Sequence, residues 1–305
     1  MINMRRMVLA VAAMAVLGSP AWAQEDKAAA VLKDMRKALG GDKLEQAKSL
    51  SLEGPFQREM GARQMRGTLA ISVALPDKMY RSEDLELPGG MSVERIFATN
   101  GTAAWEDQKQ RGGMGGGDMR IMLAGPGGRE LNPEAIEQAR LRRLKVELAR
   151  YLTAFFGGAN LKATWLATAE SPDGKADVIE LKNDEGGVRL FVDQTTHMPL
   201  MMQYQEVRPR MMIADGRGGG RSGRAQGPGG GRGPVDPEEM RRRMDAMPPP
   251  APSEVTVYLA DYKDANGIML PHRLTQAVDG ATVEEWTFEK VKVNPEIKSD
   301  FFDKK

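Results

Sequence analysis

The chain alternates apolar and polar residues over long stretches that begin at Ser49, after Gly158 and again after residue 253. Leu69, Ile71 and Val73 illustrate this period of two, which is typical of β-strands that bury one face. Turn dipeptides separate the runs, namely Asn100-Gly101, Asp173-Gly174, Gly186-Gly187, Asn266-Gly267 and Asp279-Gly280. The pattern therefore predicts an antiparallel meander of many short strands.

Two segments carry more detailed predictions of strand geometry. Because Leu190 lies on the more apolar side of its strand, Phe191 is predicted to point to the opposite face. In the last strand the apolar positions are even at Trp286 and Phe288 but odd further on. This change of phase predicts a β-bulge near Glu289-Lys290, which would help to curve the sheet.

Two segments instead show helical spacing. The first follows residue 23, carries apolar residues at Ala28, Leu32, Met35 and Leu39, and ends at Gly40-Gly41. The second begins with Asn132 as N-cap and Pro133 at the first helical position. Its predicted apolar stripe runs through Ile136, Leu144, Leu148, Tyr151, Leu152 and Phe155 and stops before Gly157-Gly158. Two such helices are too few to form a core alone, so we expect both to lie on the sheet.

Two further segments have the composition of loops. Residues 110–130 are rich in glycine and methionine and predict a flexible loop. Residues 208–252 are rich in Gly, Arg and Pro, and this composition cannot bury enough apolar surface to order itself. Strands are predicted on both sides of this insert, so it is interpreted as a long disordered loop within one domain that spans residues 24–305.

The N-terminus has the three parts of a secretory signal peptide. Arg5 and Arg6 precede the apolar run Met7–Leu17, and small residues at Ala21 and Ala23 mark a cleavage site. The apolar run is too short to cross a bilayer. We therefore expect residues 1–23 to be removed on export and the mature protein to work in the periplasm. The chain has no cysteine, which excludes a lipid-modified N-terminal cysteine, disulfides and thiolate metal sites.

Charge and residue types argue against several functions. Loss of Arg5 and Arg6 changes the formal net charge from +1 to −1, so no overall field favours nucleic acid. The only histidines are His197 and His272, and no serine lies in a G-x-S-x-G motif. We therefore expect no enzyme activity, no cofactor and no metal. Methionines near His197 could bind Cu(I), but the adjacent Met201 and Met202 point to opposite strand faces, which argues against a shared site.

Several segments of the sequence, taken in order, resemble the periplasmic outer-membrane lipoprotein carrier and lipoprotein-sorting-like superfamily. They are VLKDMRKALGGDKLEQAKSLSLEG, LPDKMYRSE, NGTAAWED, LFVDQTTHMPLMMQYQE and DYKDANGIMLPHRLTQAVDGATVEEWTFEKVKVNPEI. The resemblance implies an incomplete antiparallel β-barrel that curves around an apolar cavity, is covered by helices and binds acyl chains. It agrees with the residue patterns, which predict many short strands joined by hairpin turns and two amphipathic helices. With the resemblance, we expect an α+β fold in which a strongly curved antiparallel sheet of about 11 strands forms an incomplete β-barrel covered by two or more helices.

The first functional hypothesis is a noncatalytic periplasmic binding or carrier protein, monomeric, for a lipid, acyl chain or lipoprotein, with envelope membrane proteins as further candidate partners. Its candidate cavity lining is Phe97, Trp105, Trp165, Phe191, Leu270, His272, Trp286 and Phe288. His272 has an alternative interpretation as a core histidine bonded to a neighbouring backbone group. The second hypothesis is an envelope interaction or scaffold protein whose half-barrel is filled by its own side chains and whose insert recruits a partner.

Overall fold

The computed structural model describes residues 21–304 apart from 61–62, 88–89, 112–132, 159–160, 173, 184–185, 208–250 and 299. Residues 1–20 of the predicted signal peptide, most of the predicted loop 110–130 and nearly all of the predicted insert 208–252 lie outside the described residues. Residues 21–23 form the start of the first helix, and residues 110–111 belong to a strand.

The described chain forms one sheet of 13 strands in which every neighbouring pair is antiparallel. The strands are β1 (Ser49–Met60), β2 (Arg63–Ala74), β3 (Lys78–Leu87), β4 (Met91–Thr99), β5 (Ala104–Arg111), β6 (Lys162–Ser171), β7 (Gly174–Asn183), β8 (Gly186–Asp193), β9 (Pro199–Glu206), β10 (Ser253–Ala265), β11 (Ile268–Val278), β12 (Ala281–Thr287) and β13 (Lys290–Val293). This architecture confirms the predicted antiparallel fold with two more strands than the expected number.

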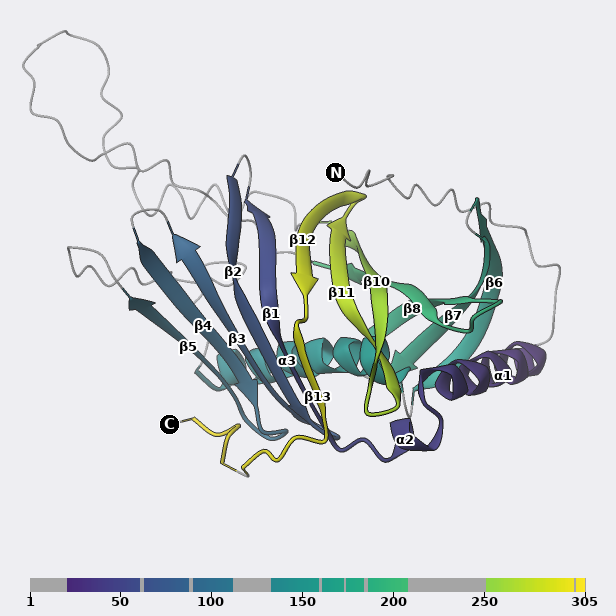
Figure 1. The fold of residues 1–305 in the computed structure, drawn as a ribbon, viewed down its shortest axis with the longest axis horizontal. Helices are drawn as coiled ribbons and strands as arrows, with labels where there is room; N and C mark the ends of the chain where they lie inside the picture. The colour runs from purple at the N-terminus through teal and green to yellow at the C-terminus, as the bar shows by residue number, and fades with distance from the viewer. Residues whose placement is uncertain are drawn as a thin grey trace, which may run out of the picture.

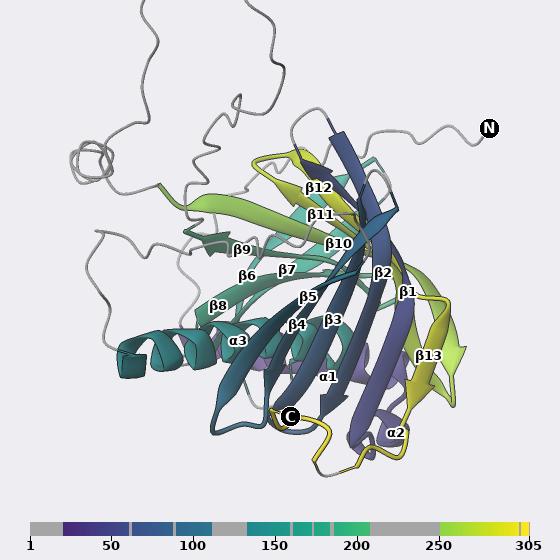
Figure 2. The same ribbon diagram turned by 90° about the vertical axis from the view of Figure 1, so that its left-hand side faces the viewer.

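The strand order joins the two halves of the chain. It runs β5-β4-β3-β2-β1-β12-β11-β10-β9-β8-β7-β6, with β13 also paired to β1. The C-terminal strand β12 therefore pairs with the first strand β1, while β5 and β6 lie at opposite ends of the sheet. Figures 1 and 2 show the sheet curving into an open trough, the predicted incomplete barrel.

Three helices accompany the sheet in the described residues. Helix α1 (Ala21–Leu39) contacts β6 and β11, and the short α2 (Asp42–Glu45) follows it. Helix α3 (Pro133–Phe156) contacts β3, β4 and β5 and lies along the concave side of the sheet (Figure 1). Both predicted helices are thus present and lie on the sheet as expected.

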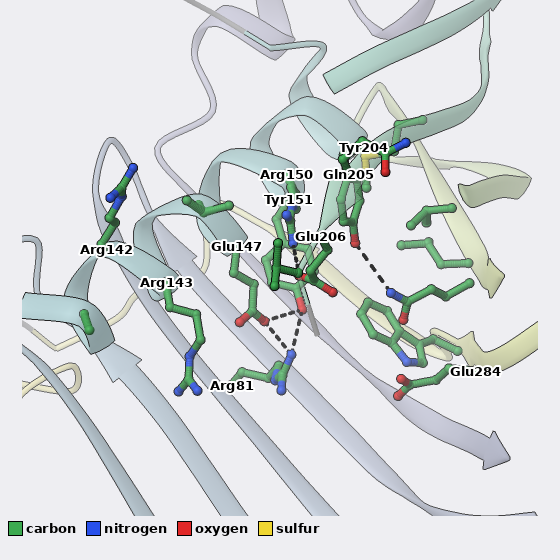
Figure 3. A pocket seen from close by; sticks show the side chains of 18 of the residues that line it. Arg81, Arg142, Arg143, Glu147, Arg150, Tyr151, Tyr204, Gln205, Glu206 and Glu284 are labelled. Atoms are coloured by element: carbon green, nitrogen blue, oxygen red, sulfur yellow. Dashed lines mark hydrogen bonds and ion pairs between the residues drawn. The ribbon is translucent and has the colours of Figure 1, made fainter. Parts of the chain in front are cut away.

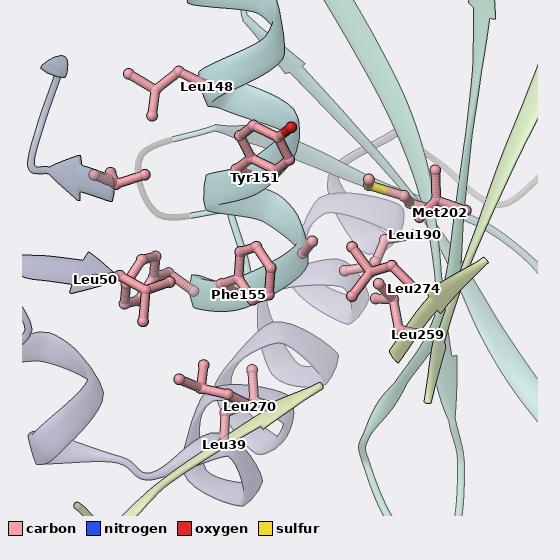
Figure 4. Packing of buried hydrophobic residues seen from close by; sticks show 14 of the residues in the cluster. Leu39, Leu50, Leu148, Tyr151, Phe155, Leu190, Met202, Leu259, Leu270 and Leu274 are labelled. Atoms are coloured by element: carbon pink, nitrogen blue, oxygen red, sulfur yellow. The ribbon is translucent and has the colours of Figure 1, made fainter. Parts of the chain in front are cut away.

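The main core fills the space between the helices and the concave face of the sheet. Helix α1 buries all four of its predicted apolar residues there. Figure 4 shows Leu39 of α1 beside Leu270 of β11, and Phe155 of α3 facing Leu50 of β1. These contacts hold the two ends of the chain and both long helices in one apolar cluster.

The predicted stripe of α3 is correct only for its C-terminal part. Leu144, Leu148, Tyr151 and Phe155 are buried, whereas the side chain of Ile136 is 40% exposed. The prediction for Ile136 is therefore wrong. Residues 134–139 are all exposed because the first turns of α3 extend past the surface on which the rest of the helix packs.

The two predictions of strand geometry are confirmed. Phe191 lies in a second, smaller apolar cluster on the other side of the sheet from Leu190. At the end of the chain, the pairing with β1 is interrupted between β12 and β13, where the backbone N–H of Glu289 donates to the carbonyl of Glu53. The interruption lets Phe288 and Val293 both face the core despite their different phase.

Candidate functional site

A pocket with a volume of about 1070 Å³ lies between α3 and the concave face of the sheet. Helix α3 forms one wall, and residues of β1, β3, β9, β10, β11 and β12 form the other. Its lining comprises Arg58, Arg81, Ala135, Gln138, Ala139, Arg142, Arg143, Val146, Glu147, Arg150, Tyr151, Met202, Tyr204, Gln205, Glu206, Val207, Val257, Leu274, Gln276, Glu284 and Trp286.

The sheet side of the pocket has an apolar floor. Met202, Val257 and Leu274 are buried and come from three adjacent strands, β9, β10 and β11. Tyr151 and Trp286, whose ring centroids are 6.1 Å apart, close the floor at the α3 side. An apolar floor is usual for a site that binds a small organic ligand. The lining around this floor is rich in charged and amide side chains.

Trp286 is the only one of the eight predicted lining residues that lines this pocket. It also packs against Phe288, at 6.4 Å between ring centroids, so it stands at the border between pocket and core. Its indole N–H is buried and has no hydrogen-bond acceptor in the described part of the chain. The sequence therefore identified one of the three described aromatic side chains that line the pocket; it missed Tyr151 and Tyr204.

Besides Trp165, which is buried in the main core, three predicted lining residues are buried on the concave side instead of lining the pocket. Phe288 is 2% exposed and lies edge-on to Phe155, while Leu270 is fully buried. The Nδ1 atom of His272 is 3.0 Å from the carbonyl oxygen of Leu270. This contact agrees with the alternative interpretation of His272 as a core histidine bonded to a neighbouring backbone group. These side chains face the concave side as expected, but helices α1 and α3 already cover that part of the trough.

Trp165 and Phe97 lie beside charged groups outside the pocket. The indole N–H of Trp165 donates to Asp177 at 2.8 Å, and the Lys27 ammonium of α1 lies 3.5 Å from the centroid of its ring. Phe97 is half-buried, with the guanidinium of Arg81 at 4.6 Å from its ring centroid. Phe97 thus adjoins a lining residue without lining the pocket.

Trp105 and Phe191 are on the other face of the sheet. Trp105 contacts Tyr80, and its indole N–H donates to the carbonyl of Phe302 at 3.0 Å, so the C-terminal segment covers it. Phe191 packs in the small cluster with Val178 and Met201. Because side chains alternate along a strand, neither residue can reach the concave face.

Charged residues at inward positions form the polar end of the pocket, and sequence reasoning missed them. Glu83, 1% exposed, accepts hydrogen bonds from both terminal nitrogens of Arg58, at 3.1 and 2.9 Å, and pairs with Arg81 at 2.9 Å. Arg58 also reaches Glu284 at 2.9 Å. A signal was present, because Arg81 and Glu83 occupy the same phase of β3 as the buried Met79.

The pKa values of this group follow from burial and pairing. Burial alone would raise the pKa of Glu83, but Arg81 and Arg58 lower it below its usual range. Burial alone would lower the pKa of Arg58, yet Glu83 and Glu284 raise it above its usual range. Glu83, Arg58 and Arg81 therefore stay ionised over the physiological pH range.

A second set of polar contacts ties α3 to the sheet. Arg81 donates to Glu147 of α3, and the hydroxyl of Tyr151 donates to the same carboxylate at 2.9 Å (Figure 3). Burial raises the pKa of Tyr151 well above its ordinary value, and Glu147 raises it further. The tyrosine therefore remains a neutral hydrogen-bond donor, and the helix is fixed at the middle of its length.

The remaining ion pairs of the pocket lie nearer its rim. Arg150 of α3 pairs with Glu206 at 2.8 Å and lies 3.6 Å from the centroid of the Tyr204 ring. Arg143 pairs with Glu106 of β5. Figure 3 shows Arg142 and Arg143 on one side of the Arg81–Glu147–Tyr151 contacts and Tyr204 on the other.

The described residues show neither a metal centre nor a membrane-spanning helix. Within them, no cluster of three or more His, Asp or Glu side chains could hold a metal ion. Likewise, none of α1 to α3 is long and apolar enough to cross a bilayer.

Comparison with known proteins finds similarity only at the level of solved structures. No protein-family model matches the chain, and no curated protein sequence matches it. A LolA superfamily protein from Nitrosomonas europaea is similar with 10% identity and a TM-score of 0.45, over 91% of this chain and 97% of its own.

Two further structures are similar to a comparable extent. A Vibrio parahaemolyticus domain described as an outer membrane lipoprotein-sorting protein has 9% identity and a TM-score of 0.43, over 92% of this chain and 97% of its own. A DUF1329 family protein from Desulfovibrio piger has 7% identity and a TM-score of 0.44, over 90% and 97%. The chain is thus similar in structure to LolA-superfamily and lipoprotein-sorting proteins.

Proposed function

We propose that this chain is a noncatalytic periplasmic binding or carrier protein that takes up a hydrophobic chain in the pocket between α3 and the sheet. The observation that carries the proposal is a pocket of about 1070 Å³ whose floor is formed by Met202, Val257 and Leu274. Ligand pockets for small molecules have volumes of about 300–1,000 Å³, so this one could hold an acyl chain. In the proposal, residues 1–23 are removed on export and residues 24–305 form the single functional domain.

Affinity would come from burial of methylene groups on the apolar floor. Each buried methylene contributes about 0.8 kcal/mol, so two more would tighten binding by up to about 15-fold. Displacement of the neutral dye N-phenyl-1-naphthylamine by decyl and dodecyl maltoside, below their micelle concentrations, measures this dependence. Equal affinities for the two chain lengths would contradict burial of the chain.

A bulky substitution on the exposed part of α3 tests whether the pocket is the site. Ala139 is exposed and lines the pocket, so Ala139→Trp should obstruct the entrance without disturbing the core. We expect it to weaken dodecyl maltoside binding at least fivefold. The matched control is Glu137→Trp on the same helix, an exposed residue outside the lining. If both variants bind dodecyl maltoside like the parent protein, the alkyl chain of the ligand binds outside this pocket.

Mass spectrometry on organic extracts of protein purified from the periplasm then tests the function itself. Stoichiometric lipid is the expected result. The scaffold hypothesis, in which the trough is closed by its own side chains, would be favoured by a different result. In that case the purified protein is repeatedly empty, and the maltosides do not displace the dye from it.

A further inference from the structure

The described part of the pocket lining contains more positive than negative side chains. Among the described residues, five arginines and three glutamates line the pocket. Each of these glutamates contacts an arginine: Glu147 contacts Arg81, Glu284 contacts Arg58, and Glu206 contacts Arg150. Arg142 and Arg143, which are consecutive on α3, are therefore not matched by a carboxylate of the lining.

Arg142 has no hydrogen bond or ion pair with any residue that the structure describes, and its side chain is exposed at the rim of the pocket. It lies on the same stripe of α3 as Ala135, Ala139 and Val146, which also line the pocket and are three, four or seven positions away. The small side chains on this stripe leave space beside the guanidinium.

Arg143 lies one position further round the helix. It pairs with Glu106 of β5, but Glu106 also lies 3.5 Å from Arg140. Burial lowers the pKa of Arg143, and the nearby guanidinium of Arg81 lowers it further, against the effect of Glu147. Positive charge is thus concentrated at this end of the pocket, where an anion would relieve the repulsion.

We propose that the pocket selects amphiphiles with an acidic head group, a phosphate or carboxylate, which Arg142 and Arg143 bind at the rim while the alkyl chain lies on the apolar floor. The inference rests on the proposed function, because it places the chain of the ligand in the same pocket. Guanidinium groups suit this role because their planar N–H donors match two oxygens of a phosphate or carboxylate.

The test compares three ligands that share one chain: dodecyl phosphate, dodecylphosphocholine and dodecyl maltoside. Each displaces N-phenyl-1-naphthylamine from the full chain at low salt and below its micelle concentration. We expect dodecyl phosphate to bind at least tenfold more tightly than dodecyl maltoside, with this preference decreasing as salt is added. Inorganic phosphate should not displace dodecyl phosphate at equal concentration, because it lacks the chain. Effective displacement would mean that the site takes a free anion and would overturn the proposal.

A charge-removing substitution identifies the group that binds the head. Arg142→Gln is expected to weaken dodecyl phosphate binding about five- to tenfold and dodecyl maltoside binding less than twofold. Arg142→Lys keeps the charge and should restore part of the preference. Lys145→Gln is the matched control, because it removes one positive charge from the same helix outside the lining. Thermal melts of each variant confirm that the fold is intact.

The outcomes separate the two proposals. If dodecyl maltoside binds but dodecyl phosphate binds no better, the proposed function stands and the head-group inference is wrong. If Lys145→Gln acts like Arg142→Gln, the effect is one of overall charge and the assignment to the rim is wrong. If none of the three ligands displaces the dye, the proposed function fails and the inference fails with it.

Discussion

Replacing Glu83 by glutamine removes the central carboxylate of the buried charge group while keeping the size of the side chain. In the parent protein this carboxylate accepts three contacts of 2.9–3.1 Å from Arg58 and Arg81. Both arginines would remain, each with only one other carboxylate partner, Glu284 or Glu147. Removal of one partner from a buried ion pair costs about 3–5 kcal/mol, since the remaining charge is left without compensation. We expect Glu83→Gln to lower the free energy of unfolding by this amount.

Urea unfolding, followed by circular dichroism and tryptophan fluorescence, measures the effect. A loss of this size corresponds to a decrease of about 1–2 M in the midpoint urea concentration. Glu86→Gln is the matched control because Glu86 lies on the same strand with an exposed side chain. The control should change the free energy of unfolding by less than about 0.5 kcal/mol.

The pH dependence tests whether charge is the cause. The pKa of Glu83 is lowered in the folded state from an ordinary value of 4.5, so its contribution is complete above that pH. The contribution is lost as the pH falls through the lower folded-state pKa. The stability difference between the parent protein and Glu83→Gln should therefore be constant from pH 7 to about 5 and shrink in more acidic solution. A difference below 1 kcal/mol at pH 7, or one that does not change with pH, would refute the reasoning.

Three further predictions concern other parts of the fold. Phe302→Ala removes a buried ring and should cost about 3–5 kcal/mol, with a red shift of Trp105 fluorescence as the covering segment detaches. Gly54→Ala would place a Cβ 1.9 Å from the carbonyl oxygen of Thr287, so soluble expression and the melting temperature should both drop sharply. Deletion of residues 210–250, whose composition predicts no packed core, should leave the melting temperature nearly unchanged; a large loss would contradict that prediction.

The strands, helices and turns of the fold were predictable because each of them has its own local sequence pattern. The turn at Asn266-Gly267 joins β10 to β11, as its type implies, and both residues adopt the positive φ that such a turn requires. The change of phase after Phe288 predicted the interruption between β12 and β13. The sequence patterns that predict such a turn or interruption involve only neighbouring residues, so they can be recognised directly in the sequence.

The pocket was harder to predict because it depends on contacts between distant segments. Trp105 was assigned to the cavity, yet the C-terminal segment around Phe302, 197 residues later, covers it on the opposite face. Six aromatic residues were expected to line the cavity, but only Trp286 does so. The others lie in the main core, beside charged groups or on the opposite face of the sheet, and arginines occupy the rim. Apolar periodicity marks which residues are buried; it does not distinguish a filled part of the trough from an open one.

Helix α3 explains why the trough is filled at one end and open at the other. From Leu144 onward the helix packs on the core, and its last turns meet Phe288 through Phe155. Before that point most of its residues are exposed, and those that line the pocket have small or polar side chains. The contacts among Arg81, Glu147 and Tyr151 lie at the border and hold the helix there through charge-assisted hydrogen bonds. Since the core and these contacts fix the helix without a ligand, the pocket can exist before any ligand enters, and binding need not supply the free energy of ordering α3.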